Sequence, residues 1–84
     1  MQALQVIDHI YWSDRWSAEI GRQLAVADSS EGLFIFPEGM SRRQILEVLR
    51  EVPADLYRLF ELEPAAEADC QVMADSGACY RSPH

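Results

Sequence analysis

Two cysteines and two histidines are the side chains of this sequence best suited to hold a metal ion. Cys70, Cys79 and His84 follow the pattern C-x8-C-x4-H, and His9 is available as a fourth ligand. Zinc sites usually bring two ligands together on a tight turn such as C-x2-C, and this sequence has no such turn. We therefore expect no metal and no other cofactor. A protein that uses these residues as thiols or metal ligands is only the third function that we consider, after a protein-interaction module and a homo-oligomeric subunit.

Nucleophilic catalysis needs a base within hydrogen-bonding distance of the nucleophile, together with a site for the developing oxyanion. The sequence contains neither G-x-S-x-G nor a cysteine-protease signature. Its many carboxylates do not indicate an acid–base pair, because they are abundant throughout an acidic chain. A chain of 84 residues also has little room for a deep pocket. We predict that the protein is not an enzyme.

An anion site is suggested by residues 37–43, which join a glycine, a capped helix start and two arginines. The loop matches no known phosphate-binding pattern, and Glu38 opposes an anion. We therefore interpret Arg42 and Arg43 as exposed helix surface. If they bind a partner, bidentate contact with a carboxylate or phosphate is the expected mode.

The charge balance is the strongest compositional signal. Fourteen acidic residues oppose seven arginines, the chain has no lysine, and the net charge is −7. Such a surface repels phosphate backbones, so we expect no direct nucleic-acid binding, and we expect attraction to basic protein surfaces instead. The alternative is that the acids only keep the domain soluble. The acids expected to bind a partner form an arc over the second half of the chain: Glu47, Glu51, Asp55, Glu61 and Glu63.

Aromatic residues gather where the first strand should meet the first helix. Tyr11, Trp12 and Trp16 are of the residue types enriched at interface hot spots. The alternative for both tryptophans is a place in the core, because a small domain needs its large apolar groups inside. Tyr11 is expected on the strand face opposite Trp12, so it is the aromatic residue that we expect to be exposed.

The apolar periodicity predicts the elements that position these residues. Residues 4–12 favour a strand, although a helix also fits, and Leu4 and Val6 would share its buried face with Ile10 and Trp12. Ser41 and Gln44 fit a capping box, in which each side chain satisfies a backbone N–H of the other residue. The elements that follow the first strand are a helix over 14–28, a loop over 28–32, a strand over 33–36, helices over 41–51 and 53–62, and strands over 70–74 and 78–82.

The last two strands predict a hairpin around the turn at residues 75–77. A three-residue loop pairs Met73 with Cys79 and Val72 with Tyr80. In that register Cys70 lies near Ser82, so a disulfide between the two cysteines is not favoured. Two cysteines are also too few for a disulfide scaffold, and we expect free thiols in a reducing compartment.

The element order β-α-β-α-α-β-β predicts a small α+β single domain over residues 1–84, with one small sheet and the helices packed on one face. If the first two strands are parallel, their crossover should be right-handed. The alternative fold is mostly α with a short hairpin. Residues 64–84 are either a C-terminal hairpin or a loosely ordered tail. No apolar run could cross a membrane, and no signal peptide is recognisable, so we expect a cytoplasmic protein that does not bind membranes.

The function predicted from these observations is a small acidic protein-interaction module that blocks or modulates a partner protein. By analogy of composition, it could be a phage or mobile-element antagonist, an anti-defence inhibitor that occupies a basic nucleic-acid-binding surface. The alternative is a homo-oligomeric structural or accessory subunit. Such a subunit would pair through a sheet edge at residues 32–36 or in the terminal hairpin.

Overall fold

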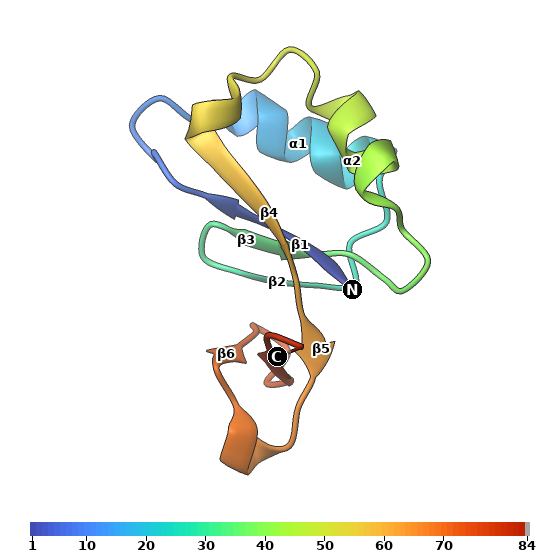
Figure 1. Cartoon of the computed structure of the whole chain (residues 1–84). Coiled ribbons are helices and arrows are strands. Elements are labelled where there is room, and N and C mark those ends of the chain that lie inside the picture. The colour runs from blue at the N-terminus through green and yellow to red at the C-terminus, as the bar shows by residue number, and fades with distance from the viewer. Residues whose placement is uncertain (84) are drawn as a thin grey trace.

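A computed structural model describes residues 1–83, which form two helices and seven strands in two antiparallel sheets (Figure 1). The predicted α+β class is confirmed, whereas the mostly helical alternative is wrong. The elements are β1 (Gln2–Val6), α1 (Asp14–Gln23), β2 (Asp28–Ser30), β3 (Leu33–Ile35), α2 (Arg42–Val48), β4 (Tyr57–Glu61), β5 (Glu63–Pro64), β6 (Val72–Met73) and β7 (Cys79–Arg81), with short 3₁₀ turns at Ala54–Leu56 and Glu67–Asp69.

The main sheet has the strand order β2-β3-β1-β4, so the first strand of the chain lies at its centre. Leu4 of β1 pairs with Phe34 of β3 on one side and with Leu59 of β4 on the other. Because β1 and β3 are antiparallel, the handedness rule for a parallel crossover does not apply. The loop predicted over residues 28–32 is instead β2 and the tight turn of a hairpin. Gly32, at a φ of +69°, provides the left-handed residue of that turn.

Both helices begin where the sequence predicts. The Ser13 hydroxyl accepts a hydrogen bond from the backbone N–H of Arg15, and Ser41 and Gln44 form the predicted capping box. Neither helix, within the described part of the chain, is long and apolar enough to cross a membrane.

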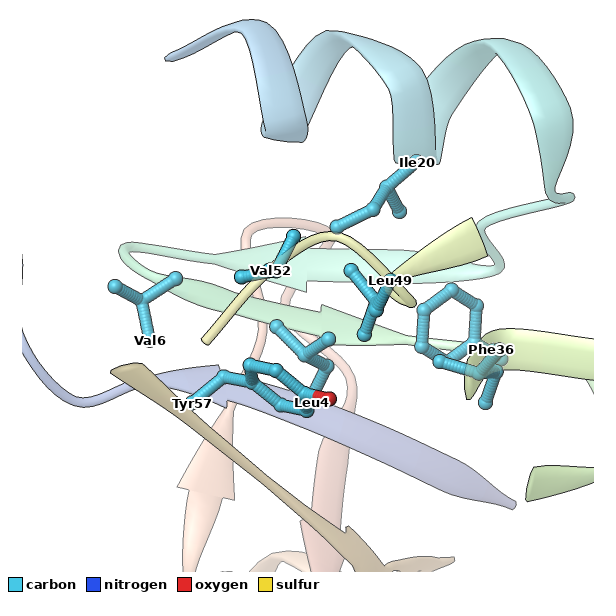
Figure 2. Close-up of a cluster of buried hydrophobic side chains, with 8 residues drawn as sticks. Leu4, Val6, Ile20, Phe36, Leu49, Val52 and Tyr57 are labelled. Carbon is cyan, nitrogen blue, oxygen red and sulfur yellow. The ribbon is translucent and has the colours of Figure 1, made fainter. Parts of the chain in front are cut away.

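The two helices cover one face of the main sheet (Figure 1). Ile20 points from α1 toward Leu4 of β1, and Phe36 closes one side of this core (Figure 2). Ile45 of α2 and Leu49 at its C-terminal cap are buried. The buried members of this cluster are Leu4, Val6, Ile20, Phe36, Ile45, Leu49, Val52 and Tyr57.

The helix predicted over residues 53–62 is wrong: a single 3₁₀ turn there is followed by strand β4. A helix over these residues would bury Leu56, Leu59 and Phe60 on one face. In β4, Leu59 faces the helices, while Phe60 pairs with Ala3 on the opposite face of the sheet. Because both faces of the sheet are covered, neighbouring apolar residues suit this strand as well as they suit a helix.

The last part of the chain forms a second, small sheet in the order β5-β7-β6, on the side of the main sheet away from the helices (Figure 1). We call residues 62–83 the C-terminal lobe. Its hairpin has the predicted register, with Met73 opposite Cys79 and Val72 opposite Tyr80. The expectation of one sheet covered on one face is wrong, because the lobe covers the second face. The buried residues between the two sheets are Ala3, Leu33, Ile35, Leu62, Ala74 and Tyr80.

Cys70 and Cys79 form a disulfide, with their Cα atoms 5.1 Å apart, so the expectation of free thiols is wrong. The hairpin register was correct, but Cys70 does not continue the strand. It ends the 3₁₀ turn Glu67–Asp69, and this places its sulfur beside Cys79. The position near Ser82 is filled by Gln71, whose side-chain oxygen accepts a hydrogen bond from the Ser82 N–H (2.9 Å).

The carboxylate of Asp28 fastens the C-terminal lobe to the outer strand of the main sheet. It accepts hydrogen bonds from the Ser76 hydroxyl, from the Tyr80 hydroxyl (3.1 Å) and from the Ser29 N–H (3.0 Å). The Ser76 bond is the main reason why the pKa of Asp28 lies below its ordinary value. Burial, and then the neighbouring Asp28, raise the pKa of Tyr80.

These two shifts predict a stability that falls at both extremes of pH. The contribution of Asp28 is present above its ordinary pKa and is lost as the pH falls through its lowered pKa. That of Tyr80 is present below the ordinary tyrosine pKa of about 10 and is lost as the pH rises through its raised pKa. We expect Asp28→Asn to flatten the acid limb in urea unfolding measured against pH. An acid limb identical to that of the native chain would contradict this role for Asp28.

Candidate functional site

Among residues 1–83, the loop between β1 and α1 carries three of the five large apolar side chains that are exposed. Ile7, Ile10 and Tyr11 are 55, 89 and 72% exposed. The other large exposed apolar side chains, Leu46 and Met73, lie apart from it in α2 and in the C-terminal lobe. We call residues 7–13 the 7–13 loop. Its concentration of exposed apolar groups is typical of an interaction site.

The backbone of the 7–13 loop is tied by hydrogen bonds within the loop and to Leu56. The Asp8 carboxylate accepts from the N–H groups of Ile10 (3.1 Å) and Tyr11 (3.4 Å), and the Asp8 carbonyl accepts from the Trp12 N–H (3.1 Å). The Ile7 N–H donates to the carbonyl of Leu56 (2.8 Å). This is an aspartate-initiated turn, and it presents Ile10 and Tyr11 at its tip.

His9 holds the same loop from another side. Its ring lies so close to Gly32 that a Cβ atom there would overlap with it. Position 32 therefore needs a glycine for two reasons: its φ is positive, and the ring of His9 occupies the space where a Cβ atom would lie. The sequence suggested His9 as a metal ligand, and the structure gives it this packing contact instead.

The two tryptophans are the base of the loop and not its exposed tip. The ring centroids of Trp12 and Trp16 lie 5.3 Å apart in an edge-to-face arrangement, and Tyr57 lies 6.4 Å from Trp12. The indole N–H of Trp12 donates to the hydroxyl of Ser17 (2.8 Å). Both tryptophans are half-buried against the helix-side core. Tyr11 is exposed as expected, although it lies in a turn and not on a strand.

Four carboxylates belong to the 7–13 loop or to residues next in sequence to it or to its contacts. Asp8 and Asp14 belong to the loop and to the helix after it, and Asp55 precedes the residue that accepts the Ile7 hydrogen bond. Glu31 precedes Gly32, which contacts His9. None of these four carboxylates takes part in an ion pair with another residue of the described range 1–83. We call these four carboxylates the acidic rim of the 7–13 loop.

The acidic arc expected from the sequence is not a single surface. Glu47 and Glu51 line a shallow cavity of about 370 Å³ between the two helices, which Trp16 also lines. Asp55 lies near the 7–13 loop, whereas Glu61 is at the other end of β4, a strand that spans roughly 13 Å at the usual rise per residue. Glu63 is in the lobe, where it pairs with Arg81 (2.9 Å).

Arg42 and Arg43 are exposed on α2, as the sequence predicts, and line a second, open hollow with Leu46 and Arg50. They belong to an uneven charge distribution. Residues 14–24 and 41–51 contain five of the seven arginines and four of the fourteen acids. The helical layer is thus slightly basic, and the rest of the chain carries the acidic excess.

The residues expected to act as metal ligands or thiols do not form such a site within residues 1–83. No group of three metal-binding side chains comes together there, and the disulfide leaves neither cysteine as a thiolate ligand. His84 lies outside the described residues. Compared with known families, curated proteins and solved structures, the chain shows no significant match.

Sequence reasoning missed Ile7 and Ile10. Ile10 was assigned to the buried face of a longer strand, but β1 ends at Val6. The available signal was Asp8, which interrupts the apolar run and is a residue type that starts turns.

Proposed function

We propose that this protein is an interaction module whose 7–13 loop inserts Ile10 and Tyr11 into an apolar pocket of a partner protein. The observation that carries the proposal is the exposure of these side chains, 89 and 72%, on a backbone held by Asp8. Exposed apolar groups on a mobile loop would lose conformational entropy on binding. When the loop is already ordered in the free protein, most of that entropy has been lost before binding.

The size of the two side chains suits them to be anchors. Burying an isoleucine or an aromatic side chain contributes roughly 1.5–3 kcal/mol, and tyrosine is among the residues enriched at hot spots. The half-buried Trp12 and Trp16 support the loop from below, as the rigid base that a hot spot requires.

The acidic rim defines the chemistry of the partner. A pocket ringed by arginine or lysine would complement Asp8, Asp14, Glu31 and Asp55 and would be attracted by the net charge of −7. Proteins that hold nucleic acid have such basic surfaces, and an inhibitor of that kind of protein is the finer form of this proposal. A cytoplasmic phage antagonist has less support, because lasting disulfides are typical of oxidising compartments.

The test places a photo-crosslinking amino acid at Tyr11, in the cells from which the chain comes. A second copy of the experiment places it at Met73, which is also exposed but lies in the C-terminal lobe. We expect Tyr11 to capture one protein that Met73 does not capture. Equal products from the two positions would contradict a specific site on the 7–13 loop.

Substitutions then measure the contribution of the loop. We expect Ile10→Ala and Tyr11→Ala each to weaken binding of the captured partner by about 30-fold, which corresponds to about 2 kcal/mol. Met73→Ala is the matched control and should change the affinity less than about twofold. Raising the salt concentration should weaken binding. An affinity that does not depend on salt would overturn the acidic-rim part of the proposal.

A further inference from the structure

Strand β4 forms one edge of the main sheet, and its pairing shows which backbone groups point away from the sheet. Met1 and Leu62 exchange two hydrogen bonds of 2.8 Å, and Ile7 donates to Leu56 across the other end of the pair. Residues on an antiparallel strand alternate between bonding inward and outward. With this register, Tyr57, Leu59 and Glu61 direct their N–H and carbonyl groups outward.

These outward groups have no hydrogen-bond partner within residues 1–83. The opposite edge of the sheet is different: β2 is short, and the carbonyl of Ser29 accepts a hydrogen bond from Asp75 of the C-terminal lobe (2.7 Å). The lobe therefore covers one edge and leaves the other open. β4 also contains no proline, so each outward position keeps its N–H donor for pairing with a further strand.

We propose that β4 pairs with β4 of a second copy of this chain, antiparallel and with the two-fold axis at Leu59. The three outward-facing residues are placed symmetrically about Leu59, and each copy would donate from their N–H groups and accept at their carbonyls. The two four-stranded sheets would become one continuous sheet. Of the two edges expected from the sequence, residues 33–35 form an inner strand, so that one is wrong. The terminal hairpin does supply an edge strand, β6, but it is only two residues long.

The side chains of β4 also fit this pairing. Arg58 would lie opposite Phe60 of the second copy, and Tyr57 opposite its Glu61, so no like charges face each other across the axis. Within one copy the Arg58 guanidinium already lies 4.7 Å from the centre of the Phe60 ring. A cation–π contact with the second copy's ring would have the same chemistry.

This association is independent of the 7–13 loop and responds to salt in the opposite direction. Two copies with a net charge of −7 repel each other at long range, so screening strengthens their pairing, whereas it weakens binding to a basic partner. The Tyr11→Ala variant should therefore still dimerise. Loss of one property without the other would show which of the two proposals fails.

The first experiment measures the mass and the amide exchange of the native chain over a range of concentrations. Between about 10 μM and 1 mM, sedimentation should show a shift from one to two copies. The amides of Tyr57, Leu59 and Glu61 should exchange at least about tenfold more slowly at the high concentration. A single copy at every concentration and salt, with no added protection of these amides, would overturn the proposal.

Glu61→Pro tests the edge directly, with Glu61→Ala as its matched control. Glu61 is exposed and its N–H points away from β1, so proline removes an outward donor and no hydrogen bond of the sheet. Both variants lose the weak contact between Gln2 and Glu61. We expect the dimer dissociation constant to rise at least about tenfold for Glu61→Pro and to change little for Glu61→Ala. Equal dimerisation by a folded Glu61→Pro variant would place the contact elsewhere.

Discussion

Replacing Phe36 with alanine should lower the free energy of unfolding by about 3–5 kcal/mol. Phe36 is the largest of the fully buried side chains and follows β3, at the edge of the helix-side core (Figure 2). Ile20 and Leu49 reach this core from the two helices and Leu4 from the sheet. A cavity at this point would therefore loosen the contact between the two layers.

The measurement is urea unfolding followed by tryptophan fluorescence, because Trp12 and Trp16 pack against the same core. In a domain of this size the loss is a large share of the total stability, so the variant should be partly unfolded at 37 °C. Leu46→Ala is the control, since Leu46 is exposed on α2, and it should cost less than about 1 kcal/mol. If Phe36→Ala lowers the free energy of unfolding by less than about 1.5 kcal/mol, the core around Phe36 is not tightly packed, because a tightly packed core does not tolerate such a cavity.

Loss of the Cys70–Cys79 disulfide should lower the free energy of unfolding by about 2–3 kcal/mol, the value expected for closing a loop of about ten residues. The two residues are nine apart in sequence. The lobe is also held to the main sheet by the Asp28 contacts, by backbone hydrogen bonds of Asp75 with Ser29 and of Leu62 with Met1, and by the small apolar cluster. The ion pairs of Arg81 lie within the lobe. We expect the lobe to loosen first, so the amides of Ala74 and Tyr80, which bond within the hairpin, should exchange faster than those of β1.

Urea unfolding with and without a reductant measures this contribution. The double variant Cys70→Ser, Cys79→Ser should match the reduced native chain, and the reductant should have no further effect on it. If the reductant leaves the stability and the exchange of the native chain unchanged, the disulfide does not stabilise the lobe.

Local signals in the sequence predicted what depends on neighbouring residues. Ser41 and Gln44 formed the capping box because both partners lie within one turn of helix. The turn at residues 75–77 set the register of the last hairpin, so Met73 met Cys79. The exposure of Tyr11 was also predicted, and it is the part of the candidate site that the sequence identified.

The features that the sequence did not predict depend on residues that are distant in the chain but close together in the fold. Residues 57–61 became a strand because β1, more than fifty residues earlier, pairs with them; an apolar stripe alone does not separate the two structures. The disulfide depended on the direction in which the chain enters the hairpin, which the register does not determine. The hydrogen bonds between Asp8 and the rest of the 7–13 loop form because β1 ends before Asp8. The end of a strand is set by its pairing with other strands, which the local sequence does not show.

The position of β1 in the middle of the main sheet has a consequence for how the chain folds. Gln2 pairs with Glu61, so the central strand gains its second neighbour only after more than fifty further residues have been synthesised. Contacts between such distant segments require closure of a long loop before they stabilise anything, which places folding among the slower, millisecond-to-second domains. Until then one side of β1 is open to pairing with other chains, and this nascent stage is the time at which the protein is most exposed to aggregation.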